Sequence, residues 1–155
     1  IQELAERLTA IPFTSGNHVE LLVNGQATFD AMLSAIESAT NYILLQTYIL
    51  EDDPTGNRFR EALIQKASQG IRVYLLYDGI GTRKLSRAYL RSLRQSVVSV
   101  KIFKSTKGRG NLWQINFRNH RKILIVDGAI GFVGGLNIGD EYLGLKPPLS
   151  PWRDT

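Results

Sequence analysis

The sequence contains no cysteine and only two histidines, His18 and His120. Disulfide bonds and thiolate metal sites are therefore excluded, and two histidines are too few for a metal site built from several imidazoles. No apolar run approaches the roughly 20 residues needed to cross a bilayer, and no signal-peptide pattern opens the chain. These absences indicate an ordinary globular domain without an embedded span. We therefore expect this domain to use no metal ion and no cofactor.

Acidic residues are outnumbered, with 14 Asp and Glu against 19 Lys and Arg, so the formal net charge is +5. A basic balance favours anionic partners such as phosphate esters, nucleic acid or acidic lipid, without choosing among them. The length of 155 residues suits one domain with a real core. We predict an N-terminal helix and linker over residues 1–12 and a single domain over 13–155. Because the chain starts at Ile1 and stops at Thr155 without an obvious ending, we expect it to be a piece of a longer protein.

Hydrophobic periodicity predicts helices that alternate with strands. The predicted helices span residues 1–10, 27–39, 57–69 and 86–95, and the predicted strands span 19–23, 42–50, 71–77, 97–103, 118–126 and 130–133. Turns are expected at Asn24-Gly25, Asp52–Gly56 and Asp127-Gly128. The strand over 42–50 is nearly all apolar, so we expect it to be central and covered on both faces. The order predicts an α/β fold with a mixed, mostly parallel β-sheet flanked by helices.

The stretch NHRKILIVDGAIGFVGGLN, residues 119–137, combines polar residues with a buried-strand pattern. Strand side chains alternate between faces, so His120 and Lys122 lie side by side near the start of the strand. An imidazole can act as a nucleophile or carry a proton, and an ammonium can neutralise phosphoryl oxygens. A bare His-x-Lys at a strand end is more often a solvated pair, so the chemistry depends on the longer pattern around it.

The longer pattern is His120-x-Lys122-x-x-x-x-Asp127, then six residues, then Gly134-Gly135-x-Asn137. It resembles the HxKxxxxD(x)6G(G/S)xN signature of the phospholipase D superfamily at every spaced position. Further segments extend the resemblance to the first catalytic half of a bacterial cardiolipin synthase: 16–17, 41–48, 53–56, 70–73, 77–81, 137–142 and 152–155. The resemblance implies a phospholipase D-like α-β-α sandwich.

The resemblance also implies roles for the residues of the motif. His120 would be the nucleophile, through a covalent phosphohistidine, or the general acid and base. Lys122 and Asn137 would bind phosphate, with Gly134 and Gly135 leaving room for it, and Asp127 would orient or tune the histidines. The implied reaction transfers a phosphatidyl group between two phosphatidylglycerol molecules, at an anionic membrane surface on the cytoplasmic face of the bacterial inner membrane.

That mechanism needs two histidines at once, and this chain carries one motif. The surroundings of His18 (Asn17-His18-Val19-Glu20) do not match the motif, so we interpret His18 as a structural residue. The second histidine would come from a second motif downstream in the native chain or from a homodimer partner. Two alternatives therefore stay open: a homodimeric nuclease or phosphodiesterase of the same superfamily, and a non-catalytic phosphate-binding half-module.

Other features permit two interpretations each. From Lys101 to Lys122 there are seven Lys or Arg and no acid, interleaved with Trp113 and other apolar residues. This basic stretch could meet an anionic membrane or a nucleic acid, or be a solvated loop. We interpret Asp78 as a turn residue rather than a cleft residue, whereas a cleft role for Gln46 is open. The remaining charged groups read as a turn (51–53) and as the solvated face of a helix: Arg83, Lys84, Arg87, Arg91 and Arg94.

Overall fold

The structure is a computed structural model that describes residues 2–103, 118–145 and 152–155. Its helices are α1 (Gln2–Thr9), α2 (Asn24–Ser38), α3 (Pro54–Ser68), α4 (Arg87–Gln95) and the short 3-10 helix η1 (Asp140–Leu143). Its strands are β1 (Tyr42–Thr47), β2 (Arg72–Asp78), β3 (Ser99–Phe103), β4 (Ile123–Val126) and β5 (Ile130–Val133). Within the described residues, none of the helices combines the length and the apolar character needed to span a bilayer.

The strands form one mixed sheet in the order β3-β2-β1-β4-β5. β1 pairs in parallel with β2, and β2 with β3, whereas β4 runs antiparallel to both β1 and β5. The predicted mixed sheet with flanking helices and the central position of β1 are therefore confirmed. Because β1, β2 and β3 are parallel, their carboxyl ends meet at one edge of the sheet. The antiparallel β4 begins at that same edge.

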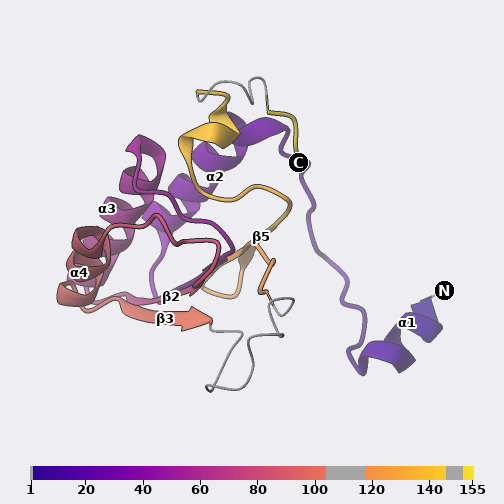
Figure 1. Cartoon of the computed structure of the whole chain (residues 1–155). Coiled ribbons are helices and arrows are strands. Elements are labelled where there is room, and N and C mark those ends of the chain that lie inside the picture. Colours follow the sequence, from indigo (N-terminus) through magenta and orange to yellow (C-terminus); the bar gives the residue numbers. More distant parts are fainter. Residues whose placement is uncertain (1, 104–117, 146–151) are drawn as a thin grey trace, which may run out of the picture.

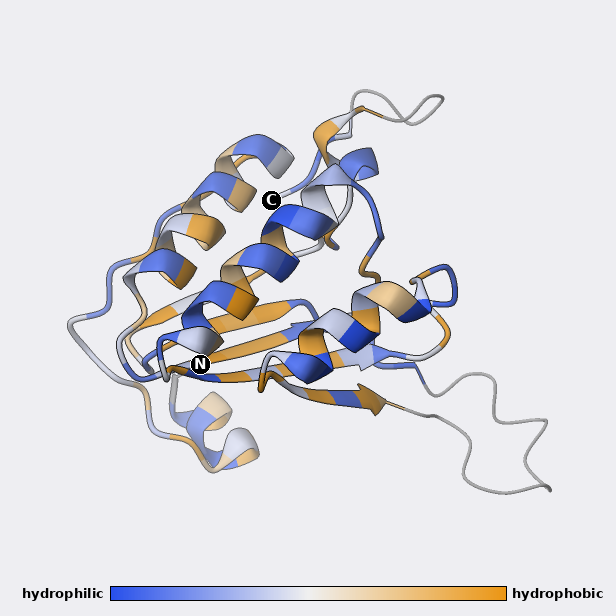
Figure 2. Cartoon of the chain, turned by 90° about the vertical axis from the view of Figure 1, so that its left-hand side faces the viewer, coloured by the Kyte–Doolittle hydropathy of each residue, from blue (hydrophilic) through white to orange (hydrophobic). Residues whose placement is uncertain are grey.

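Helices α2, α3 and α4 lie side by side over one face of the sheet, with their hydrophilic sides outward (Figures 1 and 2). On β1, β2 and β4 the residues that point to this face are buried, and the helices pack their apolar stripes against them. The core includes Phe29, Ile36, Ile43, Phe59, Leu63, Leu75, Leu93 and Leu124, each at most 3% exposed. This packing supports the sheet up to the carboxyl ends of β1, β2 and β3.

The other face of the sheet is not covered in the part of the chain that the structure describes. Leu44 on β1 is 38% exposed and Tyr74 on β2 is 44% exposed, although Ile43 and Val73 beside them are buried. The prediction that the 42–50 strand is covered on both faces is therefore wrong for these residues. An all-apolar run cannot distinguish a doubly covered strand from one whose second face is apolar but open.

The segment before α2 also departs from the prediction. Residues 19–23 are extended but belong to no strand, and Asn24-Gly25 begins α2 instead of forming a turn. Two tertiary contacts explain the difference: the Asn24 amide donates to the carbonyl of Asp154, and a side chain on Gly25 would collide with the carbonyl of Tyr142. Helix α1 lies apart from the domain at the far end of this segment (Figure 1).

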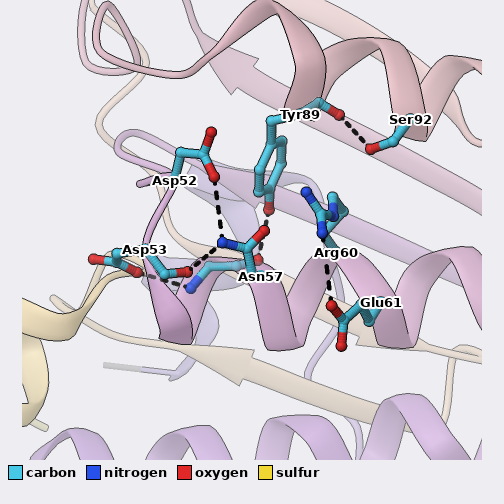
Figure 3. Close-up of polar contacts among 8 residues, drawn as sticks. Asp52, Asp53, Asn57, Arg60, Glu61, Tyr89 and Ser92 are labelled. Atoms are coloured by element: carbon cyan, nitrogen blue, oxygen red, sulfur yellow. Dashed lines mark hydrogen bonds and ion pairs between the residues drawn. The ribbon is translucent and has the colours of Figure 1, made fainter.

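The N-terminus of α3 connects three parts of the chain (Figure 3). Asp53 caps the helix by accepting from the amide of Gly56 at 2.9 Å, with Pro54 in the first turn. Its other oxygen accepts from the amide of Asp140 at 2.8 Å, and the Tyr89 hydroxyl donates to the Gly56 carbonyl at 2.6 Å. The predicted turn over Asp52–Gly56 is therefore a helix start, and it anchors the segment that follows the Gly-Gly-x-Asn motif.

Candidate active site

His120 and Lys122 lie in extended backbone just before β4, at the edge where β1, β2 and β3 end. The predicted strand over 118–126 is shorter than expected, since only residues 123–126 pair with β1. The carboxyl edge of parallel strands is the usual location of binding sites in open α/β sheets. Several side chains from different strands meet here, so the structure builds a site around the predicted pair.

The side chains of His120 and Lys122 are in direct contact. The Lys122 Nζ atom lies 3.0 Å from Nδ1 of His120 and donates to the His120 carbonyl at 2.8 Å. Desolvation lowers the pKa of His120 below its ordinary value, and the charges of Lys122 and Arg118 lower it further, while Asp78 opposes them. These effects favour the neutral imidazole over the imidazolium. Desolvation also lowers the pKa of Lys122, and the carboxylate of Asp154 opposes this shift.

Tyr48, just after β1, forms the wall against which this pair rests. Its ring centroid is 4.4 Å from that of His120, and Lys122 Nζ is 5.4 Å from the centre of the Tyr48 ring. The Arg118 guanidinium donates to the Tyr48 hydroxyl at 3.2 Å. The sequence reasoning assigned Tyr48 to a strand but gave it no role in the site. Tyr48 directly follows β1, in a sheet that was predicted to be mostly parallel, and this position could have indicated that Tyr48 belongs to the site.

A polar scaffold holds the backbone beside His120. Asp78, at the end of β2 and 1% exposed, accepts from the amide of Asn119 at 3.0 Å through Oδ2. Its Oδ1 accepts from the amides of Ile80 and Gly81 at 2.8 and 3.1 Å. Asp78 thus forms the predicted turn and also holds the backbone next to His120. Gln46 reaches the same point, because its Nε2 donates to Oδ1 of Asn119 at 2.6 Å.

Asp127 lies at the opposite end of β4 from the histidine. It occupies the tight turn to β5 with φ 54°, and Gly128 follows with φ 69°, as expected for an Asp-Gly hairpin turn. Its carboxylate accepts from the amides of Thr40, Asn41 and Tyr42 at 2.7–2.9 Å. The structure therefore does not bring Asp127 to His120. Instead, the carboxylate joins the hairpin to the start of β1 and so aligns β4, the strand that follows the pair.

This arrangement predicts a pH-dependent contribution of Asp127 to stability. The hydrogen bond from the Thr40 amide, with those from Tyr42 and Asn41, holds the pKa of Asp127 well below its usual range. A carboxylate with a depressed pKa stabilises the fold above the unfolded-state pKa of about 3.9 and loses this effect at lower pH. We expect Asp127→Asn to lower the urea midpoint at neutral pH, and the deficit to shrink below about pH 4.

Urea unfolding of both proteins across this pH range measures the effect, with Asp30→Asn as the control at an exposed carboxylate. A deficit that stays constant with pH would show that the charge of Asp127 is not what holds the turn.

Asn137 is buried, 5% exposed, and both ends of its amide are engaged. Its Oδ1 accepts from the amide of Ile49 at 3.0 Å, and its Nδ2 donates to the Tyr142 hydroxyl at 2.6 Å. These bonds join the Gly-Gly-x-Asn segment to the chain that follows β1. The motif asparagine therefore lies beside the candidate site as a structural link, with one hydrogen of Nδ2 already donated.

Gly134 and Gly135 make room for the residues that end the described chain. A side chain on Gly134 would meet the Thr155 carbonyl, and one on Gly135 would lie 2.5 Å from both carboxylate oxygens of Asp154. The charge of Asp154 also acts on Lys122, and no role for Asp154 was predicted from the sequence. The resemblance at 152–155 includes this aspartate and was the available signal.

The remaining predicted features fall outside this cluster or outside the described residues. The basic stretch with Trp113 lies mostly in residues 104–117, which the structure does not describe. His18 lies in the extended segment before α2, where it is exposed.

Comparison with protein families matches residues 32–146 to the family described as "Cardiolipin synthase, PLD-like domain". Among curated proteins, the chain is 48% identical over 149 residues to cardiolipin synthase A of Pseudomonas putida strain GB-1. It is 50% identical over 149 residues to cardiolipin synthase A of Pseudomonas fluorescens strain Pf-5. Both alignments cover 96% of this chain and 31% of the relative, so the chain spans less than a third of the length of these relatives.

Solved structures show the same fold at low sequence identity. NucT from Helicobacter pylori superposes with a TM-score of 0.60 at 20% identity, covering 81% of this chain and 72% of that one. Nuc from Salmonella typhimurium, a phospholipase D family member, gives 0.57 at 21% identity, covering 85% and 76%. With a family match over most of its length and the motif spacing intact, the chain belongs to the phospholipase D-like domains of cardiolipin synthases.

Proposed function

We propose that this chain is the first catalytic half of a cardiolipin synthase, which transfers a phosphatidyl group from one phosphatidylglycerol to another and releases glycerol. The contact of His120 with Lys122, 3.0 Å between Nδ1 and Nζ at the carboxyl edge of the sheet, carries this proposal. A neutral imidazole can attack phosphorus, and the adjacent ammonium can neutralise the charge that develops on the phosphoryl oxygens.

The proposed reaction has two balanced steps. In the first, Nε2 of His120 forms a bond to phosphorus while the bond from phosphorus to a glycerol oxygen breaks, and the departing oxygen takes a proton from a second histidine. In the second, a hydroxyl of another phosphatidylglycerol gives its proton to that histidine and attacks phosphorus, which frees His120. Two phosphatidylglycerols become one cardiolipin and one glycerol.

The resting contact between Lys122 and His120 bears on the first step. When Lys122 is charged it donates to Nδ1, so the proton of a neutral ring resides on Nε2. Attack through Nε2 therefore requires that Lys122 leave Nδ1, so that the ring proton can move there. A bound phosphate supplies a stronger acceptor for the ammonium and so favours this change. Without phosphate, the same ring is arranged as a proton donor, which suits the alternative role of general acid.

The rest of the site is part of the same proposal. Lys122 and the second hydrogen of Asn137 Nδ2 would bind phosphate, near Gly134 and Gly135. Asp127 would act as a positioning residue through the turn that it holds. The second histidine would come from another motif in a longer protein or from a second copy of the chain, acting at an anionic membrane on the cytoplasmic face of the inner membrane.

Product analysis of the intact enzyme tests the proposal. Incubated with phosphatidylglycerol vesicles, the protein should form one glycerol per cardiolipin, measured by mass spectrometry of the lipids and an enzymatic glycerol assay. A parallel incubation with plasmid DNA tests the homodimeric nuclease. DNA cleavage without cardiolipin would replace our proposal by the nuclease, and phosphate binding without turnover of either substrate would leave a non-catalytic module.

A further inference from the structure

A cavity of about 380 Å³ lies between α2, strands β4 and β5, and the segment 18–22. This volume is within the range of about 300–1,000 Å³ that is usual for pockets that hold small ligands. Lys122 and Gln46 line the cavity, but His120 and Tyr48 do not. The cavity is therefore next to Lys122, and neither the His120 ring nor the Tyr48 ring lines it.

The wall of this cavity is mainly apolar. Met32 from α2, Leu45 from β1 and Leu124 from β4 belong to it, and all three are core residues at most 9% exposed. Phe132 and Leu136 continue the apolar wall along β5 and the segment after it. A surface of this kind favours an aliphatic ligand, because each buried methylene group gains roughly 0.8 kcal/mol, about fourfold in affinity.

Three exposed apolar residues line the cavity, beside the exposed His18 and Glu20. Val19 is 89% exposed, Leu21 is 75% exposed and Val133 on β5 is 81% exposed, and all three line the cavity. Clustered apolar side chains that remain in water mark interaction surfaces rather than ordinary surface. Exposed apolar side chains and Lys122 thus line the same cavity as the apolar wall.

We propose that this cavity holds an acyl chain of the phospholipid whose phosphate is bound by Lys122. The inference rests on the proposed function and assigns the aliphatic part of the substrate to the space enclosed by α2, β5 and segment 18–22. The ammonium of Lys122 binds the anionic phosphate, and the adjoining apolar wall contacts the acyl chain. The length of that chain is then limited by the side chains on the wall.

A binding experiment on the intact protein tests this assignment. The ligands are dihexanoyl-phosphatidylglycerol, below its micelle concentration, and glycerophosphoglycerol, which carries the same phosphate but no acyl chain. Binding is measured by calorimetry in a His120→Ala background, so that neither ligand turns over. We expect the acylated ligand to bind at least tenfold more tightly.

Thr28→Leu adds apolar volume to the cavity wall and removes only a local helix bond, from the Thr28 hydroxyl to the Asn24 carbonyl. We expect it to reduce the acyl preference at least tenfold and to leave glycerophosphoglycerol binding unchanged. Ser34→Leu, on the exposed side of the same helix, is the matched control and should change neither affinity. Val133→Asp, at an exposed residue that lines the cavity, should also reduce the preference and covers the case in which Thr28→Leu does not fold.

The assignment would be overturned if Thr28→Leu or Val133→Asp weakened the binding of both ligands equally. It would also be overturned if both variants kept the wild-type preference for the acylated ligand. A different result would contradict the proposed function. If the enzyme with His120 intact prefers the acylated ligand but forms no cardiolipin, the proposed reaction is wrong and the acyl site is retained.

Discussion

Replacing His120 with alanine is expected to lower the turnover of the intact enzyme by at least about a thousandfold. The imidazole is the only side chain of the described cluster that can both bond to phosphorus and exchange a proton near neutral pH. Its contacts with Lys122 at 3.0 Å and with the Tyr48 ring at 4.4 Å hold it at the sheet edge. The rate of cardiolipin formation from phosphatidylglycerol vesicles measures the loss.

Arg121→Ala is the matched control, because Arg121 lies between the two motif residues and is exposed. It should keep turnover within about threefold of the wild type, as expected of a surface substitution. A His120→Ala enzyme with undiminished turnover would remove His120 from the mechanism. Loss of turnover in both variants, with an altered unfolding transition, would show that the segment and not the imidazole is what matters.

Replacing Asp78 with alanine is expected to reduce both stability and activity. Its carboxylate accepts three backbone N–H groups, from Ile80, Gly81 and Asn119, at a position that is 1% exposed. Removing it leaves buried donors without an acceptor, which costs about 3 kcal/mol or more in the free energy of unfolding. Urea unfolding measures this cost, with Asp30→Ala as an exposed control that should change stability by less than about 0.5 kcal/mol.

Asp78→Asn separates positioning from folding. Asparagine keeps an oxygen for the amides of Ile80 and Gly81, but it places an NH₂ group opposite the amide of Asn119, where a donor would face a donor. We therefore expect most of the stability to be retained while turnover falls, because the backbone beside His120 shifts. Turnover that follows stability in both variants, or that survives in Asp78→Asn, would reduce Asp78 to a purely structural role.

The sequence predicted the elements and the central pair well because their signals are local. Helical periodicity over 27–39 and 57–69 gave helices within a few residues of those observed, and Ser86 caps α4 as expected. Strand alternation placed His120 beside Lys122, which the structure confirms by their direct contact. The segment at 19–23 failed, because apolar alternation there has no neighbouring strand to pair with among the described residues.

The grouping of the site could not be read from the motif alone. The resemblance implied that Asp127 orients or tunes the histidines, yet a four-residue strand separates it from Lys122. Asp78 and Asp154 lie outside the signature, yet one holds the backbone next to His120 and the other acts on Lys122. The spacing of a motif along the chain shows which residues belong to the motif. It does not show which carboxylate lies next to which side chain in the folded protein.

The sequence by itself determined the alternation of helices and strands, the family, and the pairing of an imidazole with an ammonium at a strand entrance. The alternation and the pairing depend on residues a few positions apart, whose side-chain directions follow from backbone periodicity, whereas the family follows from resemblance to a known signature. Only the tertiary structure decided which groups support that pair. The bonds from Asn119 to Asp78, from Thr40 to Asp127 and from Ile49 to Asn137 join residues 41, 87 and 88 positions apart. Such contacts form only when the sheet brings the ends of distant strands to a common edge.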